Sequence, residues 1–282
     1  MTGRIYGIVA GYDGSSGGAQ ALRWAAREAW ARGVTLTACL AWTPDHIEPP
    51  TESALYDLAR QHGQAVLTRG LPYAESVLGP GRVRADLAAG PAAQVLCEHS
   101  RTADMVVVGS RGHSELPGST LGPVAWQVAG HAAGRVVVVR GAWRPANRPP
   151  GPVVAGADGS WAGQAAVVFA FEEAALREVP LVAVCALADT PGRLGESHQV
   201  EEDFDDLMAR EEKEHPEVQV VRQVQVGTPR AALLAAAADA QMLVVGARGR
   251  DGLDEMSLGS VAQAALHLAP CPVGIVRAGA ES

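Results

Sequence analysis

The residues Ile8-Val-Ala-Gly-Tyr-Asp-Gly-Ser15 decide the fold, because they return as Val153-Val-Ala-Gly-Ala-Asp-Gly-Ser160, 145 residues further along the chain. A second stretch, Met105-Val-Val-Val-Gly-Ser-Arg-Gly112, returns as Met242-Leu-Val-Val-Gly-Ala-Arg-Gly249 at an offset of 137. The second copy is therefore shorter by eight residues between these two landmarks. Ordered matches of this kind indicate an internal repeat, so the chain is predicted to hold two copies of one domain.

The predicted domains are residues 1–141 and 152–282. The segment between them reads Gly141-Ala-Trp-Arg-Pro-Ala-Asn-Arg-Pro-Pro-Gly-Pro152. Its prolines prevent a strand or helix from continuing and make a semi-stiff linker. A chain of 282 residues also agrees with two domains of about 150 residues each.

Each copy alternates strand-like and helix-like stretches. The runs Val106–Val108, Val136–Val139 and Leu243–Val245 are apolar at successive positions, which is typical of strands buried on both faces of a parallel sheet. The fold class is therefore α/β: two tandem doubly wound domains, each a five-stranded parallel sheet in the order 3-2-1-4-5, flanked by helices. In the first copy the expected strands are Arg4–Ala10, Val34–Ala41, Val83–Leu87, Met105–Val108 and Arg135–Val139, and the expected helices are Ser16–Arg32, Ser53–Val77, Pro91–Ser100 and Gly122–Gly130.

The charge pattern argues against several classes of binding partner and enzyme. The formal net charge is −8, and no block of basic residues occurs in the sequence. Nucleic acid and anionic membranes are held by dense Lys and Arg, so neither is expected as a partner. Lys213 is the only lysine, and its acidic surroundings predict a solvated surface residue. A Walker A loop, a protein kinase and pyridoxal chemistry each need a placed lysine and are therefore disfavoured.

The four cysteines, Cys39, Cys97, Cys185 and Cys271, form no Cys-x-x-Cys pair, and no histidine cluster stands at metal-ligand spacing. No metal site is expected on these grounds. Cys39 and Cys185 lie in apolar, strand-like runs and are expected to be small buried thiols. No signal-like segment begins the sequence and no apolar run approaches the roughly 20 residues of a membrane helix, so a cytoplasmic, reduced protein is expected.

Two glycine motifs follow predicted strands, where ligands of an open parallel sheet bind. The first is Gly-x-Asp-Gly-Ser, at Gly11–Ser15 and Gly156–Ser160. The second is Gly-x-x-Gly, then nine residues, then Gly. Its members are Gly109, Gly112 and Gly122 in the first copy and Gly246, Gly249 and Gly259 in the second.

The second copy favours a polyphosphate ligand. Gly259-Ser260 opens a predicted helix, whose free N–H groups and dipole make an anion site. Ser260 adds a hydroxyl donor, and Arg248 adds a positive charge. Ordinary turn glycines, with Asp158 as a helix N-cap, are the alternative interpretation. The nine-residue spacing and the aspartate after the first strand favour phosphate binding over that alternative.

At these residues the sequence resembles the universal stress protein family, across both halves and nearly the full chain. Gly246-Ala-Arg-Gly249 through Gly259-Ser260, then Ala269-Pro-Cys-Pro-Val-Gly-Ile-Val-Arg277, is similar to that family's ATP-binding signature and final strand. The resemblance implies ATP as ligand, alone or with Mg²⁺. It also implies little or no catalytic machinery, and hence a non-catalytic or very slow nucleotide-dependent regulator of the stress response.

The resemblance further implies which residues hold the nucleotide. Asp158 would face the adenosine with Gly156 beside it, and the backbone near Ala186 would form one wall of the adenine pocket. The full set in the second copy is Gly156, Asp158, Ala186, Gly246, Ala247, Arg248, Gly249, Arg250, Gly259, Ser260 and Val261. In the first copy it is Gly11, Asp13, Ala41, Gly109, Ser110, Arg111, Gly112 and Gly122.

Pro123 departs from the family's pattern. Proline is comfortable at a helix's first position, so the fold is not affected. It offers neither an N–H nor a hydroxyl, so two phosphate donors are missing unless Ser119, Thr120 or a metal ion compensates. The better ATP site is therefore predicted in the second copy.

Two other classes of function stay open. An ATP-dependent adenylating or amidating enzyme of related fold would carry Ser-Gly-Gly-x-Asp-Ser after the first strand, and Ser16-Gly17-Gly18-Ala19-Gln20 lacks its Asp and final Ser. A ligand-independent interaction module is the more serious rival, because the family includes proteins that do not bind nucleotide. A dinucleotide oxidoreductase is disfavoured, since Gly7, Gly11 and Gly14 have the wrong spacing.

No catalytic residue is predicted. Ser15 and Ser160 each follow Asp-Gly at a helix start, where serine is a good cap rather than a nucleophile. His113 and His267 lie nearest the loops and are expected to be surface histidines. The acidic run Glu201–Glu214 is expected to be a solvated helix face.

The last strands of the two copies, Val136–Arg140 and Val273–Arg277, are apolar and lie at the edges of their predicted sheets. An uncovered apolar edge strand promotes aggregation, so we expect another strand to pair with each. We expect the copies to pair along these strands as an intrachain pseudo-dimer, as the family's dimers do, with a homodimer of chains as a further option.

Overall fold

The computed structural model describes residues 7–43, 54–113, 120–140, 150–187, 194–249 and 258–277. The chain divides into two compact units, Met1–Val139 and Arg140–Ser282. Each unit is a complete α/β layer structure, in which helices alternate with parallel strands.

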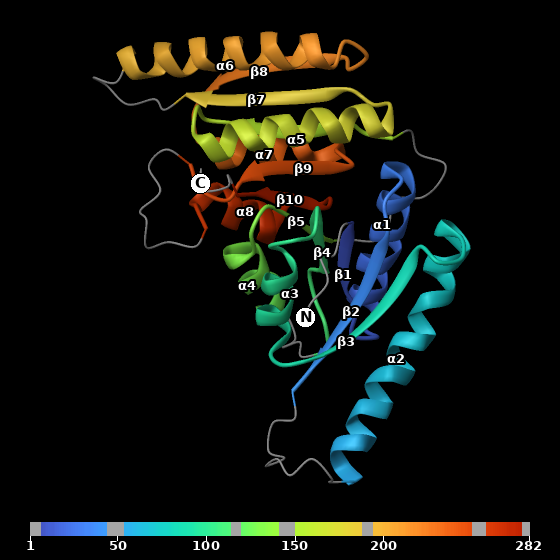
Figure 1. The fold of residues 1–282 in the computed structure, drawn as a ribbon. Helices are drawn as coiled ribbons and strands as arrows, with labels where there is room; N and C mark the ends of the chain where they lie inside the picture. The colour runs from blue at the N-terminus through green and yellow to red at the C-terminus, as the bar shows by residue number, and fades with distance from the viewer. Residues whose placement is uncertain are drawn as a thin grey trace. The chain divides into compact units, whose positions relative to one another are not determined.

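The first unit has five parallel strands in the order β3-β2-β1-β4-β5. Helices α1 and α2 pack on one face of this sheet, and α3 and α4 pack on the other (Figure 1). The elements are β1 (Ile8–Gly11), α1 (Ser16–Arg32), β2 (Leu36–Trp42), α2 (Ala54–Leu78), β3 (Val83–Ala89), α3 (Ala92–His99), β4 (Met105–Gly109), α4 (Pro123–His131) and β5 (Arg135–Val139).

The second unit repeats this topology, with parallel strands in the order β8-β7-β6-β9-β10. Helices α5 and α6 contact each other, as do α7 and α8. The elements are β6 (Val153–Ala157), α5 (Trp161–Arg177), β7 (Leu181–Leu187), α6 (Leu194–Glu214), β8 (Val220–Val226), α7 (Pro229–Ala236), the short 3₁₀ turn η1 (Ala237–Asp239), β9 (Met242–Gly246), α8 (Ser260–Leu268) and β10 (Val273–Val276).

The predicted fold class and strand order are confirmed in both units. The three apolar runs predicted to be buried on both faces, Val106–Val108, Val136–Val139 and Leu243–Val245, are all buried. Helix α1 and strand β5 have the predicted bounds, and the other elements of the first unit differ by one or two residues at their described ends. Of the strand predicted from Arg4, residues 4–6 lie outside the described residues. The pairing of the two copies along their last strands stays a prediction.

Serine starts the first helix of each copy, as the sequence predicts. The Ser15 hydroxyl accepts a hydrogen bond from the Gly18 N–H, and the Ser160 hydroxyl accepts one from the Gly163 N–H, each 3.0 Å long. These bonds satisfy a helix N–H that has no intrahelical partner, which stabilises each helix by about 1 kcal/mol. Both hydroxyls are therefore engaged in capping.

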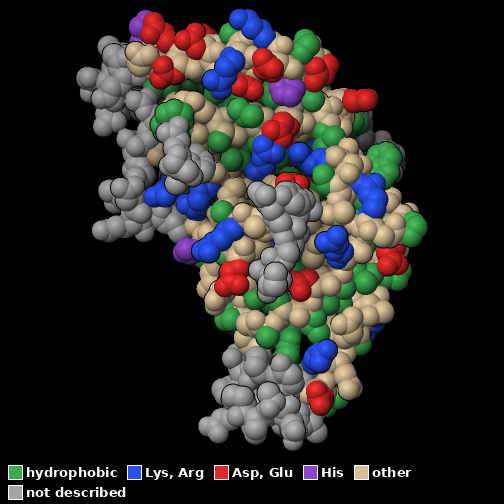
Figure 2. Space-filling view, viewed as in Figure 1, with side chains coloured by type: hydrophobic (Ala, Val, Ile, Leu, Met, Phe, Trp, Pro, Cys, Tyr) green, Lys and Arg blue, Asp and Glu red, His purple; other side chains and the backbone are tan. Residues whose placement is uncertain are grey.

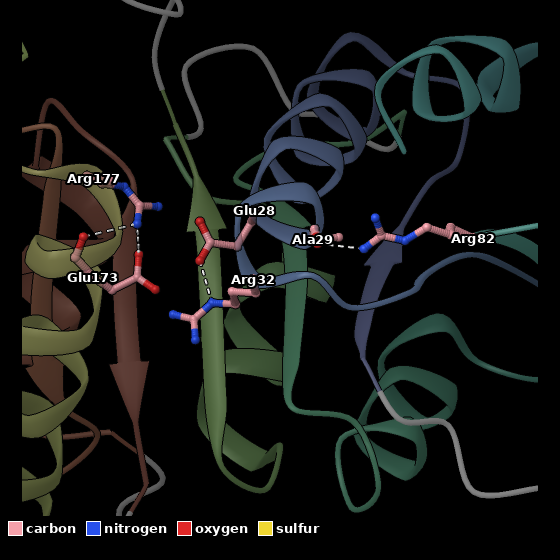
Figure 3. A network of polar contacts seen from close by, with 6 residues as sticks. All are labelled: Glu28, Ala29, Arg32, Arg82, Glu173 and Arg177. Atoms are coloured by element: carbon pink, nitrogen blue, oxygen red, sulfur yellow. Dashed lines mark hydrogen bonds and ion pairs between the residues drawn. The ribbon is translucent and has the colours of Figure 1, made fainter. Parts of the chain in front are cut away.

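The same two helices each bury one carboxylate. Glu28 of α1 is 4% exposed and pairs with Arg32 one turn later, at 2.6 Å (Figure 3). Glu173 of α5, at the equivalent position, is fully buried and pairs with Arg177 (Figure 3). A buried carboxylate needs such a partner, since an uncompensated charge costs several kcal/mol.

Helix α6 carries the acidic run, and its Asp and Glu side chains gather at the top of the view in Figure 2. Phe204, Leu207 and Met208 turn the other way and are buried. The prediction of a solvated face is confirmed except at Glu211, which is 6% exposed and pairs with Arg210. Lys213 is exposed, as predicted. Among the described residues, none of the helices has the length and apolar content to cross a membrane.

Candidate functional site

The predicted residues of the first copy meet at one cavity, at the carboxyl ends of β1 and β4. This cavity encloses about 720 Å³, part of which is open to solvent. All eight predicted residues line it: Gly11, Asp13, Ala41, Gly109, Ser110, Arg111, Gly112 and Gly122. The position agrees with the rule that ligands of open α/β sheets bind beyond the strand ends.

Each motif aspartate ties its loop to the helix that follows. Asp13 Oδ1 accepts hydrogen bonds from the Ser15 N–H at 2.9 Å and the Ser15 hydroxyl at 2.5 Å. Asp158 Oδ1 accepts the same pair from Ser160, at 3.0 and 2.6 Å. Asp13 Oδ2 also accepts from the backbone N–H of His113, at 3.2 Å. The aspartates therefore organise the loops, and Asp13 does so at the wall of the cavity.

The Gly-x-x-Gly pairs are explained by close packing. A Cβ at Gly109 would lie 2.5 Å from the backbone of Gly17, and one at Gly246 would lie 2.8 Å from the backbone of Ala162. A Cβ at Gly112 would lie 2.7 Å from Asp13 Oδ2, and one at Gly249 would overlap Asp158 Oδ2. Only glycine lets these chain segments approach so closely.

The third motif glycine has no such packing constraint. A Cβ at Gly122 would lie 3.5 Å from its nearest neighbour, and one at Gly259 would lie 3.4 Å from its own, which are ordinary contacts. The φ angles, −80° and −73°, suit any residue. Gly122 lines the cavity. Packing therefore does not require glycine at these two positions, whereas a ligand against the helix end would.

Each third glycine is the N-cap of a helix. Its N–H is already used, because Gly122 donates to the Ser110 carbonyl and Gly259 to the Ala247 carbonyl, both at 2.8 Å. Helix α4 then begins with Pro123, which has no N–H, and α8 begins with the exposed Ser260. The second copy therefore has one more backbone donor and one more hydroxyl at this helix start.

The other predicted residues of the second copy lie on the same elements as their first-copy counterparts. Gly156 is the second-to-last residue of β6, Ala186 lies near the end of β7, and Val261 is the second residue of α8. Ala247 is buried, Arg248 is half-buried, and both follow β9. Arg250 lies outside the described residues.

The Asp158 carboxylate also acts on a neighbouring thiol. The pKa of Cys185 is raised to about 11, first by burial and then by the negative charges of Glu201, Asp158 and Asp205. Cys185 is buried, as the sequence predicts, so its thiol stays protonated and unreactive.

Several residues of the cavity wall were not predicted. Cys39 lies two positions before Ala41 on β2, so strand alternation places the two on one face and could have revealed Cys39. His113, which the sequence predicts as a surface residue, is exposed and also lines the cavity. The remaining unpredicted residues come from several elements, and no local pattern marks them: Tyr12, Gly18, Ala92, Leu96, Val108, Pro123, Val124 and Ala125.

Comparison with known proteins identifies the repeated unit. The model of the universal stress protein family matches residues 7–140 and, a second time, residues 151–277. The chain belongs to the universal stress protein family. The tandem form predicted from the sequence is confirmed by the two matches.

Relatives within the universal stress protein family match nearly the full length of the chain. A universal stress protein of Mycobacterium tuberculosis is 32% identical, over 96% of this chain and 96% of its own. One from Mycolicibacterium smegmatis is 32% identical, over 96% of this chain and 97% of its own. The crystal structure of a universal stress protein from Archaeoglobus fulgidus has a TM-score of 0.71, at 18% identity, and covers 98% of this chain and 97% of that one. This last likeness shows a shared fold.

Proposed function

We propose that this universal stress protein binds ATP at its glycine loops and acts as a non-catalytic or very slow nucleotide-dependent regulator of the stress response in the cytoplasm. Gly122 and Gly259 carry the proposal. At both positions the fold has room for a Cβ, and yet both are glycine at the start of a helix. A polyphosphate seated on the helix N-terminus explains the missing side chain, because a Cβ and its substituents would occupy the ligand's space.

The second copy is proposed as the tighter ATP site. Helix α8 begins with Ser260, which offers an N–H and a hydroxyl, whereas α4 begins with Pro123, which offers neither. Hydrogen bonds to a charged group contribute about 1.5–3 kcal/mol each. The Gly-x-x-Gly loops would sit beneath the nucleotide, with Asp158 and Asp13 holding them in shape.

A regulatory rather than enzymatic role is proposed because the two serines that follow the motif aspartates, Ser15 and Ser160, are engaged in structure. The Ser15 and Ser160 hydroxyls cap helices, and each accepts a helix N–H while donating to its aspartate. A serine nucleophile needs a base that takes its proton. Here the partner of each hydroxyl is the aspartate that shapes the loop.

The proposal is tested by calorimetric titration of the full chain with ATP and with Mg²⁺-ATP, after measuring the nucleotide in freshly purified protein. Gly259→Arg fills the proposed phosphate space of the second copy, and Gly122→Arg is the matched change in the first. A Cβ has room at both positions, so the backbone is expected to keep its path, and urea unfolding of the ligand-free variants checks that the longer Arg side chain leaves the fold intact. Gly259→Arg should abolish the tight binding event, and Gly122→Arg should leave it. Unchanged ATP affinity in both variants would contradict the proposal and favour a ligand-independent interaction module.

A further inference from the structure

Three side chains that the nucleotide proposal does not use meet on the sheet of the first unit. Cys39 lies on β2, Asp86 on β3, and His99 is the last residue of α3. The sulfur, one carboxylate oxygen and one imidazole nitrogen of this group, here called the Cys39 cluster, all lie within 4.8 Å of one another. His99 Nε2 is 2.7 Å from Asp86 Oδ2.

The fold itself brings the Cys39 cluster together. The parallel register of β2 and β3 makes Cys39 and Asp86 direct neighbours, so their side chains stand on the same face of the sheet. Helix α3 packs on β2 and ends at His99, which reaches the carboxylate from that face. Residues from two neighbouring strands and from the helix that follows the second strand therefore converge without any sequence spacing that would reveal them.

We propose that the Cys39 cluster is a binding site for Zn²⁺, with Cys39 Sγ, Asp86 Oδ2 and His99 Nε2 as ligands. Thiolate, imidazole and carboxylate are the three donors that zinc takes in proteins, at about 2.3, 2.0–2.1 and 2.0–2.2 Å. Ligand atoms at those distances lie about 3.2–3.8 Å apart in a tetrahedron. Atoms already within 4.8 Å of one another need only small side-chain rotations to reach it.

The burial of the cluster suits an open site with three protein ligands. Cys39 is 2% exposed and lines the cavity at the carboxyl ends of β1 and β4, whereas the His99 and Asp86 side chains keep 15% and 34% of their surface exposed. The thiolate is thereby shielded, while the ion can enter from the exposed carboxylate and a water can fill the fourth position.

The metal-free protein holds these donors in a hydrogen-bonded resting state. Burial first, and then the charge of Asp86, raise the pKa of the Cys39 thiol, and a hydrogen bond from His99 lowers the pKa of Asp86. A divalent cation reverses the balance at sulfur, because a coordinating thiol is deprotonated outright. Zinc binding therefore releases the Cys39 proton to solvent and requires the His99 proton to leave Nε2 for Nδ1, so that two bonds to metal replace the His99–Asp86 hydrogen bond.

The second copy provides an internal control. Its equivalent positions are Val184 on β7, paired in register with Gln223 on β8, and Ala236 at the end of α7. None of these residues offers the thiolate, carboxylate or imidazole of the first copy. The same scaffold thus folds without the cluster, so packing alone does not require a cysteine, an aspartate and a histidine in the first copy.

The test uses the untagged, nucleotide-free full chain and titrates Co²⁺ as a spectroscopic probe, then Zn²⁺ in competition with a chromophoric chelator. We expect one equivalent of metal, with thiolate-to-cobalt charge-transfer absorption and the intense visible bands of tetrahedral Co²⁺. Cys39→Val, Asp86→Gln and His99→Ala each install the residue of the second copy. Each should weaken Zn²⁺ binding at least about a hundredfold, since loss of mere outer partners already costs 10–100-fold. Cys97→Ala, a neighbour on α3, is the control that should bind as before.

Two results would overturn the proposal. One is an absence of cobalt–thiolate absorption in the unmodified chain, which does not depend on any variant folding. The other is a cobalt spectrum that survives in Cys39→Val, since the sulfur ligand would then come from elsewhere. Because no nucleotide is present, the outcome is independent of ATP binding.

Discussion

The motif glycines of this protein divide into two physical kinds. Gly112 and Gly249 are glycine because the motif aspartate occupies the place of a Cβ. Gly122 and Gly259 have room for a Cβ, and we propose that a ligand is what keeps them glycine. Residue type alone could not separate these kinds, because the sequence presents all of them as one spaced motif.

This division predicts that the same substitution, glycine to alanine, destabilises the protein more at Gly249 than at Gly259. Gly249→Ala should destabilise the second unit by about 1–3 kcal/mol, because the new methyl group overlaps Asp158 Oδ2 and must push the loop away. Gly259→Ala should cost less, at most about 1 kcal/mol, because its methyl group has room and alanine is only a poorer N-cap than glycine. Urea unfolding without nucleotide measures both. Equal effects at the two positions would show that the loop packing is not what fixes Gly249.

The buried thiol of Cys185 makes stability fall at high pH. Its pKa is about 11 in the folded protein, against an ordinary value of 9.0. A raised pKa means that the folded state favours the protonated thiol, so this contribution is complete below pH 9 and is lost as the pH rises toward 11. Relative to Cys185→Ala, the unmodified chain should lose about 2 kcal/mol more of its unfolding free energy over that window. Urea unfolding at pH 7.5 and at pH 11 checks this, and parallel losses in the two proteins would contradict it.

At the scale of elements, the two copies end their first helix at the same point with different residues. Helix α1 is followed by Gly33 at φ 70°, which suits glycine, and α5 is followed by Glu178 at φ 53°. Both residues close the helix with the same pair of hydrogen bonds back to its last turn. The left-handed conformation costs a side-chain-bearing residue about 1–2 kcal/mol, and glycine adopts it freely.

Glu178→Gly should therefore stabilise the second unit by about 1 kcal/mol, somewhat less than the relieved strain because glycine also loosens the unfolded chain. The matched change Gly33→Ala should destabilise the first unit by a similar amount. Chemical denaturation followed for each unit measures both effects. A neutral Glu178→Gly would mean that the turn relaxes at no cost and that the observed φ is not a source of strain.

The elements were predictable because their signals are local. Continuous apolar runs marked the buried strands, and Ser15 and Ser160 marked helix starts to the residue. The first-copy cavity was predictable to the extent that glycine motifs sit at strand ends. The Cys39 cluster was not, and the sequence argued against any metal site, because its three residues lie on separate elements and only the register of β2 with β3 joins them.

At the scale of the whole molecule, the two copies share one fold but differ in the residues around their candidate sites. Each keeps the five-stranded sheet, the serine-capped first helix and the buried carboxylate paired with arginine. They differ in the groups that would meet ligands: the first has Pro123 and the Cys39 cluster, and the second has Ser260 and an apolar Val184. One chain can thus hold two sites of different chemistry on one scaffold.

This divergence predicts close to one tight ATP per chain. The first copy lacks an N–H and a hydroxyl at its helix start, which should weaken its site by about 3 kcal/mol, or roughly a hundredfold. At ATP concentrations 100 times the dissociation constant of the second site, that site alone gains about 2.7 kcal/mol. The melting temperature of the second unit should then rise by several degrees, at about 2–4 °C per kcal/mol.

Two substitutions at the helix starts test the reason for this inequality. Ser260→Pro should abolish most of the thermal shift, and Pro123→Ser should add a second binding event to the calorimetric titration. Proline is tolerated at the first position of a helix, as α4 demonstrates, so Ser260→Pro should leave the unfolding free energy of the ligand-free chain nearly unchanged. Two equivalent tight sites in the unmodified chain would contradict the argument, because the first copy would then draw its phosphate donors from groups other than the residue that follows Gly122.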